Sequence, residues 1–134
     1  MKFRIIAVGR IKEEWMRRGI EEYVLRLTPF TKVEFTELQE ERMPAHPSEE
    51  EKRNVLEAEG ARLISRIKDR SAVVLLDVSG RMMTSEEFSA WIDETLLRRA
   101  SEISFVVGGP FGVGENLRKR ADIRLSFSAM TFTH

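Results

Sequence analysis

Residues 72–78, with the sequence AVVLLDV, decide the fold of this chain. All of them except Asp77 are apolar, which is typical of a central parallel strand covered on both faces. Two further apolar runs, FRIIAVG at residues 3–9 and ISFVV at residues 103–107, predict buried strands of the same kind. Alternating apolar and polar residues predict two shorter strands, at residues 33–36 and 124–128.

Helical patterns separate these strands. An apolar stripe at helical spacing covers residues 15–27 and ends before Pro29, which lacks the backbone donor that the next turn would need. A short polar helix is expected at residues 115–121. Two further helices begin with a match to the capping box, in which two residues satisfy each other's free backbone donors: Ser48 with Glu51, and Thr84 with Glu87. The alternation predicts an α/β fold, a parallel sheet with helices on both faces, and ligands bind such sheets at the carboxyl ends of the strands.

The composition limits what the chain can do. Its 134 residues amount to one domain, and 22 basic against 22 acidic residues leave a net charge of zero, unlike a DNA-clamping domain with its basic face. There is no cysteine and no HExxH motif, so we expect neither thiol chemistry nor a metal site. No signal peptide is recognisable, and no apolar run approaches the roughly 20 residues that span a bilayer. We therefore expect a cytoplasmic protein.

The loop GGPFGVG at residues 108–114 is the most prominent motif. Gly109 and Gly114 have P-loop spacing, but Glu-Asn follows where Lys and Ser or Thr would bind phosphate and magnesium, which excludes nucleoside triphosphate hydrolysis. The Rossmann GxGxxG pattern fails because Gly109 and Pro110 directly follow Gly108. Two interpretations remain: a tight turn that needs glycine at positive φ, or a loop whose backbone contacts a ligand.

Charged residues also stand near the predicted strand ends. Asp77 has the position of a receiver-domain phosphoacceptor, but cations follow the first strand where paired carboxylates would be needed, so we expect Asp77 to cap the following turn. Two clusters of cations are open to two interpretations, a solvated surface or a contact with a phosphate backbone: Arg10, Lys12, Arg17 and Arg18, and Arg118, Lys119, Arg120 and Arg124.

The last segment, LSFSAMTFTH at residues 125–134, combines large apolar side chains with hydroxyls. One interpretation is a C-terminal strand that packs its apolar side into the core. The other is a pocket-lining loop whose backbone contacts a flat ligand such as adenine. Composition does not decide between them.

Several segments together resemble the RlmH family of bacterial SPOUT-class methyltransferases, which act on ribosomal RNA. They are FRIIAVGRIKEEW with IEEYVLRL, LLDVSGRMMTSEEF, FVVGGPFGVG and LSFSAMTF, and the match runs colinearly over essentially the whole chain. The resemblance implies a SPOUT-type α/β trefoil knot and a homodimer. It also implies S-adenosylmethionine as methyl donor and a pseudouridine in the 23S RNA of the large ribosomal subunit as substrate, methylated at a ring nitrogen.

Carried over residue by residue, the resemblance implies a cofactor site at the strand ends. Its members would be Leu76, Gly108, Phe127, Ser128, Ala129, Met130, Thr131 and Phe132. No general base is assigned, although His134 stands where the family has a histidine.

The end of the chain departs from the family pattern. Thr133 replaces the proline of the family's TFPH, and family members continue beyond the histidine with a helix and a short basic tail. We therefore expect one SPOUT-like domain over residues 1–134 that lacks this segment, with a knot that is incomplete. The missing segment suggests one alternative to an active enzyme, a non-catalytic cofactor- or RNA-binding remnant of the family. A generic nucleotide-binding domain is a separate alternative, which the failed phosphate motifs weaken.

Overall fold

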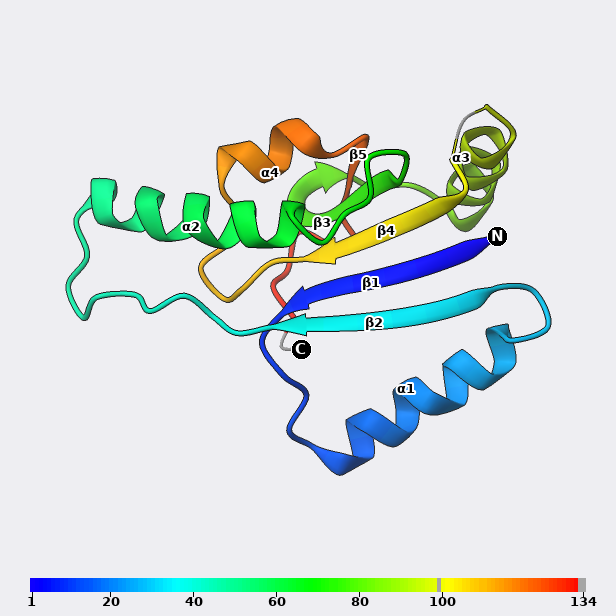
Figure 1. Cartoon of the computed structure of the whole chain (residues 1–134), viewed down its shortest axis with the longest axis horizontal. Helices are drawn as coiled ribbons and strands as arrows, with labels where there is room; N and C mark the ends of the chain where they lie inside the picture. Colours follow the sequence, from blue (N-terminus) through cyan, green and yellow to red (C-terminus); the bar gives the residue numbers. More distant parts are fainter. Residues whose placement is uncertain (99, 133–134) are drawn as a thin grey trace.

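The computed structural model describes residues 1–98 and 100–132. Its five strands form one sheet in which every neighbouring pair is parallel, in the order β2-β1-β4-β3-β5 (Figure 1). The strands are β1 (Lys2–Val8), β2 (Lys32–Leu38), β3 (Ala72–Arg81), β4 (Glu102–Val107) and β5 (Ile123–Leu125). The predicted parallel α/β sheet is thus confirmed, with the apolar AVVLLDV segment in β3, between β4 and β5.

Four helices connect the strands, at the places that the sequence predicts. They are α1 (Glu14–Leu27), α2 (Glu49–Ile64), α3 (Ser85–Arg98) and α4 (Glu115–Arg120). Both capping boxes are confirmed, because Ser48 and Glu51, and likewise Thr84 and Glu87, exchange side-chain and backbone hydrogen bonds. Thr28 is the C-cap residue of α1 and directly precedes Pro29.

Helices cover both faces of the sheet, as expected. On one face, the fully buried Val73, Leu75 and Val106 pack against Leu63 of α2 and Leu117 of α4. These two helices lie side by side in Figure 1. On the other face, side chains of α3 pack over a second apolar cluster around the strands: Phe88, Trp91, Ile92 and Leu96 against Val74 and Ile103. No helix in the described residues is long and apolar enough to cross a membrane.

One predicted boundary is wrong. The last strand was expected over residues 124–128, but β5 ends at Leu125, and Ser126 turns its hydroxyl to the carbonyl oxygens of Val78 and Ser128. Phe127 is exposed, so the apolar side of this segment does not pack into the core. The helix predicted from the apolar stripe is confirmed as α1, although none of its residues is buried. The knot stays a prediction, and His134 lies outside the described residues.

Candidate active site

Leu76 stands where three segments of the candidate site leave the sheet. It pairs with Val107 of β4 on one side and with Leu125 of β5 on the other. Gly108 directly follows Val107, and the segment from Ser126 onward directly follows Leu125. Both therefore begin next to a residue that pairs with Leu76. Because the three strands are parallel, all these segments emerge at the same edge, the carboxyl edge of the sheet (Figure 1).

A bulge follows Leu76 in β3. Leu76 and Arg81 both lie opposite Leu125, so residues 77–80 have no partner in β5. Ser79 donates from its backbone N–H (3.0 Å) and its hydroxyl (2.8 Å) to one carboxylate oxygen of Asp77. The expectation that Asp77 caps the following turn is thus confirmed. Gly80 is needed here, because a Cβ atom would lie 2.6 Å from the carbonyl oxygen of Arg124.

Asp77 also forms ion pairs with two members of the second cation cluster, Arg118 and Arg124. Its side chain is only 6% exposed, and its Oδ2 lies 3.5 Å from Nε of Arg118 and 3.4 Å from Nη1 of Arg124. Burial by itself raises the pKa of Asp77, but the hydrogen bonds from Ser79 and the charge of Arg118 outweigh burial and lower the pKa. The carboxylate is therefore ionised, and Arg118 and Arg124 have a structural role in addition to any contact with a ligand.

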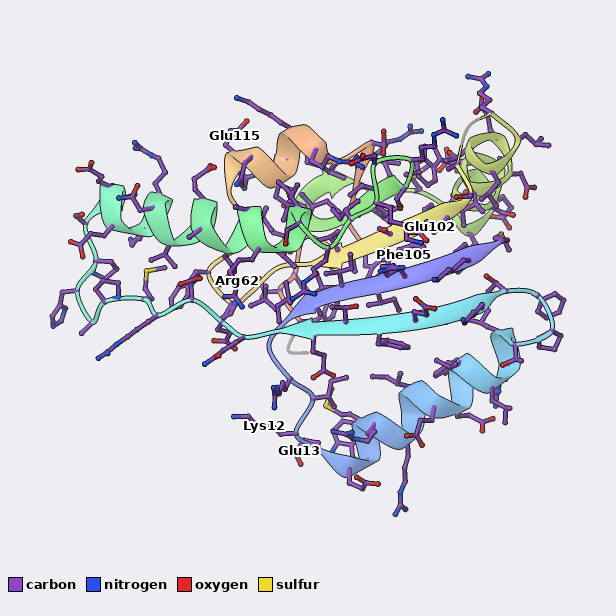
Figure 2. All side chains as sticks on the ribbon, viewed as in Figure 1. Lys12, Glu13, Arg62, Glu102, Phe105 and Glu115 are labelled. Atoms are coloured by element: carbon purple, nitrogen blue, oxygen red, sulfur yellow. The ribbon has the colours of Figure 1, made fainter. Side chains whose placement is uncertain are left out.

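The remaining cations differ in how they are engaged. Arg120 donates to the carbonyl oxygen of Ser71 and pairs with Asp122, whereas Lys119 is exposed. In the early cluster, Arg17 bonds the carbonyl oxygen of Ile11, and Arg18 pairs with Glu14. Lys12 and its neighbour Glu13 lie on the segment that leads into α1 (Figure 2). The structure thus engages Arg120 in the fold, whereas Lys119 and all four cations of the early cluster, Arg10 included, are exposed.

The segment after β5 is tied to the bulge by hydrogen bonds. The backbone N–H of Ser126 donates to the carbonyl oxygen of Arg81 (2.9 Å), and its hydroxyl lies 3.1 Å from the carbonyl oxygen of Val78. Farther along, the N–H of Met130 donates to the Ser128 hydroxyl (3.0 Å). The large apolar side chains of this segment stay outside the core, with exposed fractions of 73% for Phe127, 69% for Met130 and 66% for Phe132.

The glycine loop is a tight turn whose conformation depends on glycine. Gly112 has φ +95°, and its N–H donates to the carbonyl oxygen of Gly109 (3.2 Å). The predicted turn with positive φ is confirmed at this residue. At Gly108 a Cβ atom would lie 2.6 Å from a side-chain methyl of Val113, so the loop folds back closely on its own first residue. Whether Gly108 also contacts a ligand stays a prediction.

Helix α2 holds the segments next to this loop, a feature that the sequence analysis missed. The carboxylate of Glu57 accepts hydrogen bonds from the backbone N–H groups of Glu115 (3.0 Å) and Asn116 (3.3 Å) at the start of α4. Arg62 donates to the carbonyl oxygen of Gln39 (2.8 Å) after β2. Figure 2 labels Arg62 on α2 and Glu115 on α4. No local pattern announces these contacts, because each joins residues far apart in the chain.

Two hollows of the surface are lined by residues outside the expected cofactor site. One, of about 700 Å³, is lined by residues from the amino ends of β3 and β5 and from α3, among them Ser71, Trp91 and Asp122. The other, of about 410 Å³, lies between α1 and β2 and includes Ile20 and Phe35. Neither is lined by the expected cofactor residues. Over residues 1–98 and 100–132, no group of three or more His, Cys, Asp or Glu residues could hold a metal ion.

Comparisons with known proteins agree with this architecture. A family model described as predicted SPOUT methyltransferase matches residues 1–134. The chain is also similar to the ribosomal RNA large subunit methyltransferase H of Streptococcus pneumoniae strains CGSP14, 70585 and JJA. It is 38% identical to each over 134 residues, which are 100% of this chain and 84% of the relative. The chain therefore belongs to the SPOUT methyltransferase family.

Proposed function

We propose that residues 1–134 form an S-adenosylmethionine-dependent methyltransferase domain that modifies a ring nitrogen of a pseudouridine in 23S ribosomal RNA. The observation that carries the proposal is the meeting of Leu76, Gly108 and the segment after Leu125 at one carboxyl edge, in a chain that matches the family model from end to end. The relatives' name supplies the large-subunit RNA as substrate. The match over the full chain gives no support for a non-catalytic remnant.

The residues at this edge fit S-adenosylmethionine. Gly108 directly follows β4 at this edge and would offer its backbone groups to the ligand, on the side that Val113 leaves open. Phe127, Met130 and Phe132 offer exposed apolar surface for the flat adenine. Leu76 would form an apolar wall between them. Ser128, Ala129 and Thr131 would contribute backbone amides and carbonyls to the polar edge of the adenine.

The chemistry needs position more than a reactive side chain. Bound S-adenosylmethionine supplies an electrophilic methyl group on a sulfonium. The chain's own residues would then align the cofactor with the RNA base and exclude water. The missing phosphate-binding lysine fits this role, because methyl transfer from a sulfonium does not require it. No residue is assigned to accept the proton of the ring nitrogen.

Methyl transfer to ribosomes tests the proposal. Ribosomes from a strain that lacks the modification would be incubated with the protein and S-adenosylmethionine carrying a labelled methyl group. We expect label in the large-subunit RNA and inhibition by S-adenosylhomocysteine. Transfer to no RNA, with the protein folded, would overturn the proposal, and tighter binding of ATP than of S-adenosylmethionine would favour a generic nucleotide-binding domain.

A homodimer is part of the proposal. Helix α1 has no buried residue, and the large side chains of Trp15, Tyr23 and Leu27 are exposed along it. Apolar surface of this kind is commonly covered by a partner, and we propose a second copy of the chain. Light scattering at increasing protein concentration would measure the mass. Because its substrate would be the ribosome, we place the enzyme in the cytoplasm.

A further inference from the structure

Within α4, the Asn116 side-chain oxygen accepts from the N–H of Leu117 (2.8 Å), but the N-cap residue offers no side chain to the N–H groups of Glu115 and Asn116. Gly114 occupies the N-cap position, and helices usually place Ser, Thr, Asp or Asn there to accept from the free backbone N–H groups. At Gly114 a Cβ atom would lie 2.9 Å from the backbone carbonyl oxygen of Leu56 in α2. A side chain at this position would force the two helices apart, so the acceptor for the first two N–H groups of α4 comes from another segment.

Glu57 supplies that acceptor from α2. One oxygen of its carboxylate accepts from the N–H groups of Glu115 (3.0 Å) and Asn116 (3.3 Å). The side-chain amide of Asn116 donates in return to the backbone carbonyl oxygen of Glu57 (2.9 Å). A negative charge at the amino end of a helix is also favoured by the helix dipole. The contact is therefore reciprocal and charge-assisted, which makes it stronger than a neutral pair.

This contact fixes one end of the glycine loop. The loop begins after Val107, which the sheet holds through its pairing with Leu76. It ends at Gly114, where the start of α4 is held by Glu57. Helix α2 is itself anchored, since Leu63 is fully buried in the core, and so is Leu117 of α4. Glu57 thus connects the far end of the loop to a rigid element.

We propose that Glu57 is a positioning residue that holds the glycine loop in the conformation that receives S-adenosylmethionine. The inference rests on the proposed function, in which Gly108 contacts this cofactor. Glu57 itself would touch neither cofactor nor RNA. Its removal should therefore weaken cofactor binding and leave the rate of methyl transfer nearly unchanged once the cofactor is saturating.

The test compares Glu57→Ala and Glu57→Gln with Glu50→Ala, which removes an exposed carboxylate from the same helix. Calorimetry would measure the Kd for S-adenosylmethionine, and hydrogen exchange by NMR would follow the amides of Glu115 and Asn116. We expect Glu57→Ala to raise the Kd about tenfold and to speed exchange at both amides. Glu57→Gln keeps one acceptor oxygen and should fall between it and the wild type, whereas Glu50→Ala should change neither quantity.

Kinetics with ribosomes adds a readout that a general loss of stability would not give. For Glu57→Ala the KM for the cofactor should rise about tenfold while kcat stays within about twofold of the wild-type value. Faster exchange at the amides of Glu115 and Asn116 in Glu57→Ala, with an unchanged Kd for S-adenosylmethionine, would overturn the inference and leave the proposed function intact. If Glu57→Ala does not fold, an unchanged Kd in Glu57→Gln with faster exchange has the same meaning. Absence of cofactor binding by the wild-type chain would overturn the proposed function, and this inference with it.

Discussion

The hydroxyl of Ser126 lies 3.1 Å from the carbonyl oxygen of Val78. Val78 belongs to the bulge that follows Leu76, and Ser126 is the first residue after β5. The contact therefore joins the two segments that would enclose the cofactor from the β3 and β5 sides. Ser126 itself is buried, which keeps its hydroxyl in this position.

Replacement of Ser126 by alanine should loosen this junction. The substitution removes the hydroxyl from the carbonyl oxygens of Val78 and Ser128. We expect the free energy of unfolding to fall by about 1 kcal/mol, the usual net contribution of a hydrogen bond, and urea denaturation would measure it. Ser89→Ala, at an exposed position of α3, is the matched control and should change stability little. An equal effect of both substitutions would contradict the role of the junction.

The low pKa of Asp77 predicts a pH dependence of stability. A carboxyl whose pKa is lower in the folded than in the unfolded chain stabilises the fold above its unfolded value of about 3.8, and this contribution is lost as the pH falls through the folded value. Asp77→Asn removes the contribution. The difference in unfolding free energy between wild type and Asp77→Asn should therefore be constant from pH 7 to about 5 and shrink below about 4. Urea denaturation of both proteins at each pH measures the difference.

Other groups titrate in the same range and must cancel in this comparison. Glu34, whose pKa is lowered to about 2 mainly by Lys2 and Lys32, is present in both proteins. The difference between the two proteins isolates Asp77 for this reason. A difference that stays constant down to pH 2.5 would show that Asp77 contributes no charge-dependent stability.

A methyl group at Gly80 should disturb the pairing of β3 with β5. In Gly80→Ala the new Cβ atom would meet the backbone carbonyl of Arg124 at 2.6 Å, and neither backbone can give way without breaking the adjacent pairing. We expect a loss of about 1–3 kcal/mol in the free energy of unfolding, typical of overpacking. Gly19→Ala is the control, because nothing lies within 4 Å of its Cβ position in α1. It should stabilise the chain slightly through helix propensity, so a loss at Gly19 as large as at Gly80 would contradict the steric argument.

The sequence predicted the elements that local patterns encode. Apolar runs and capping boxes located the strands and helices, and Asp77 was correctly expected to cap its turn. The stripe at residues 15–27 located α1 correctly, but amphipathic spacing does not tell whether the same chain covers the apolar face. The cap of α4 by Glu57 was missed because a contact between residues 57 and 115 leaves no local signal.

Phe127 and Phe30 are nearly equally exposed but lie in different parts of the fold. Phe127 (73% exposed) follows β5 at the proposed cofactor site, and Phe30 (75% exposed) lies in the connection between α1 and β2. Because each buries little surface within the chain, Phe127→Ala and Phe30→Ala should each leave the free energy of unfolding within about 0.5 kcal/mol of the wild type.

Binding should separate the two variants. If Phe127 packs on the adenine, its removal forfeits most of a buried aromatic contact, and the Kd for S-adenosylmethionine should rise roughly tenfold. Phe30→Ala should bind like the wild type. Calorimetry on both variants, with light scattering to compare their masses, separates a lost cofactor contact from a lost contact between subunits. A wild-type Kd for Phe127→Ala would contradict the packing of this ring on the adenine, because the backbone hydrogen bonds of Ser126 and Met130 would hold the segment in place without the ring.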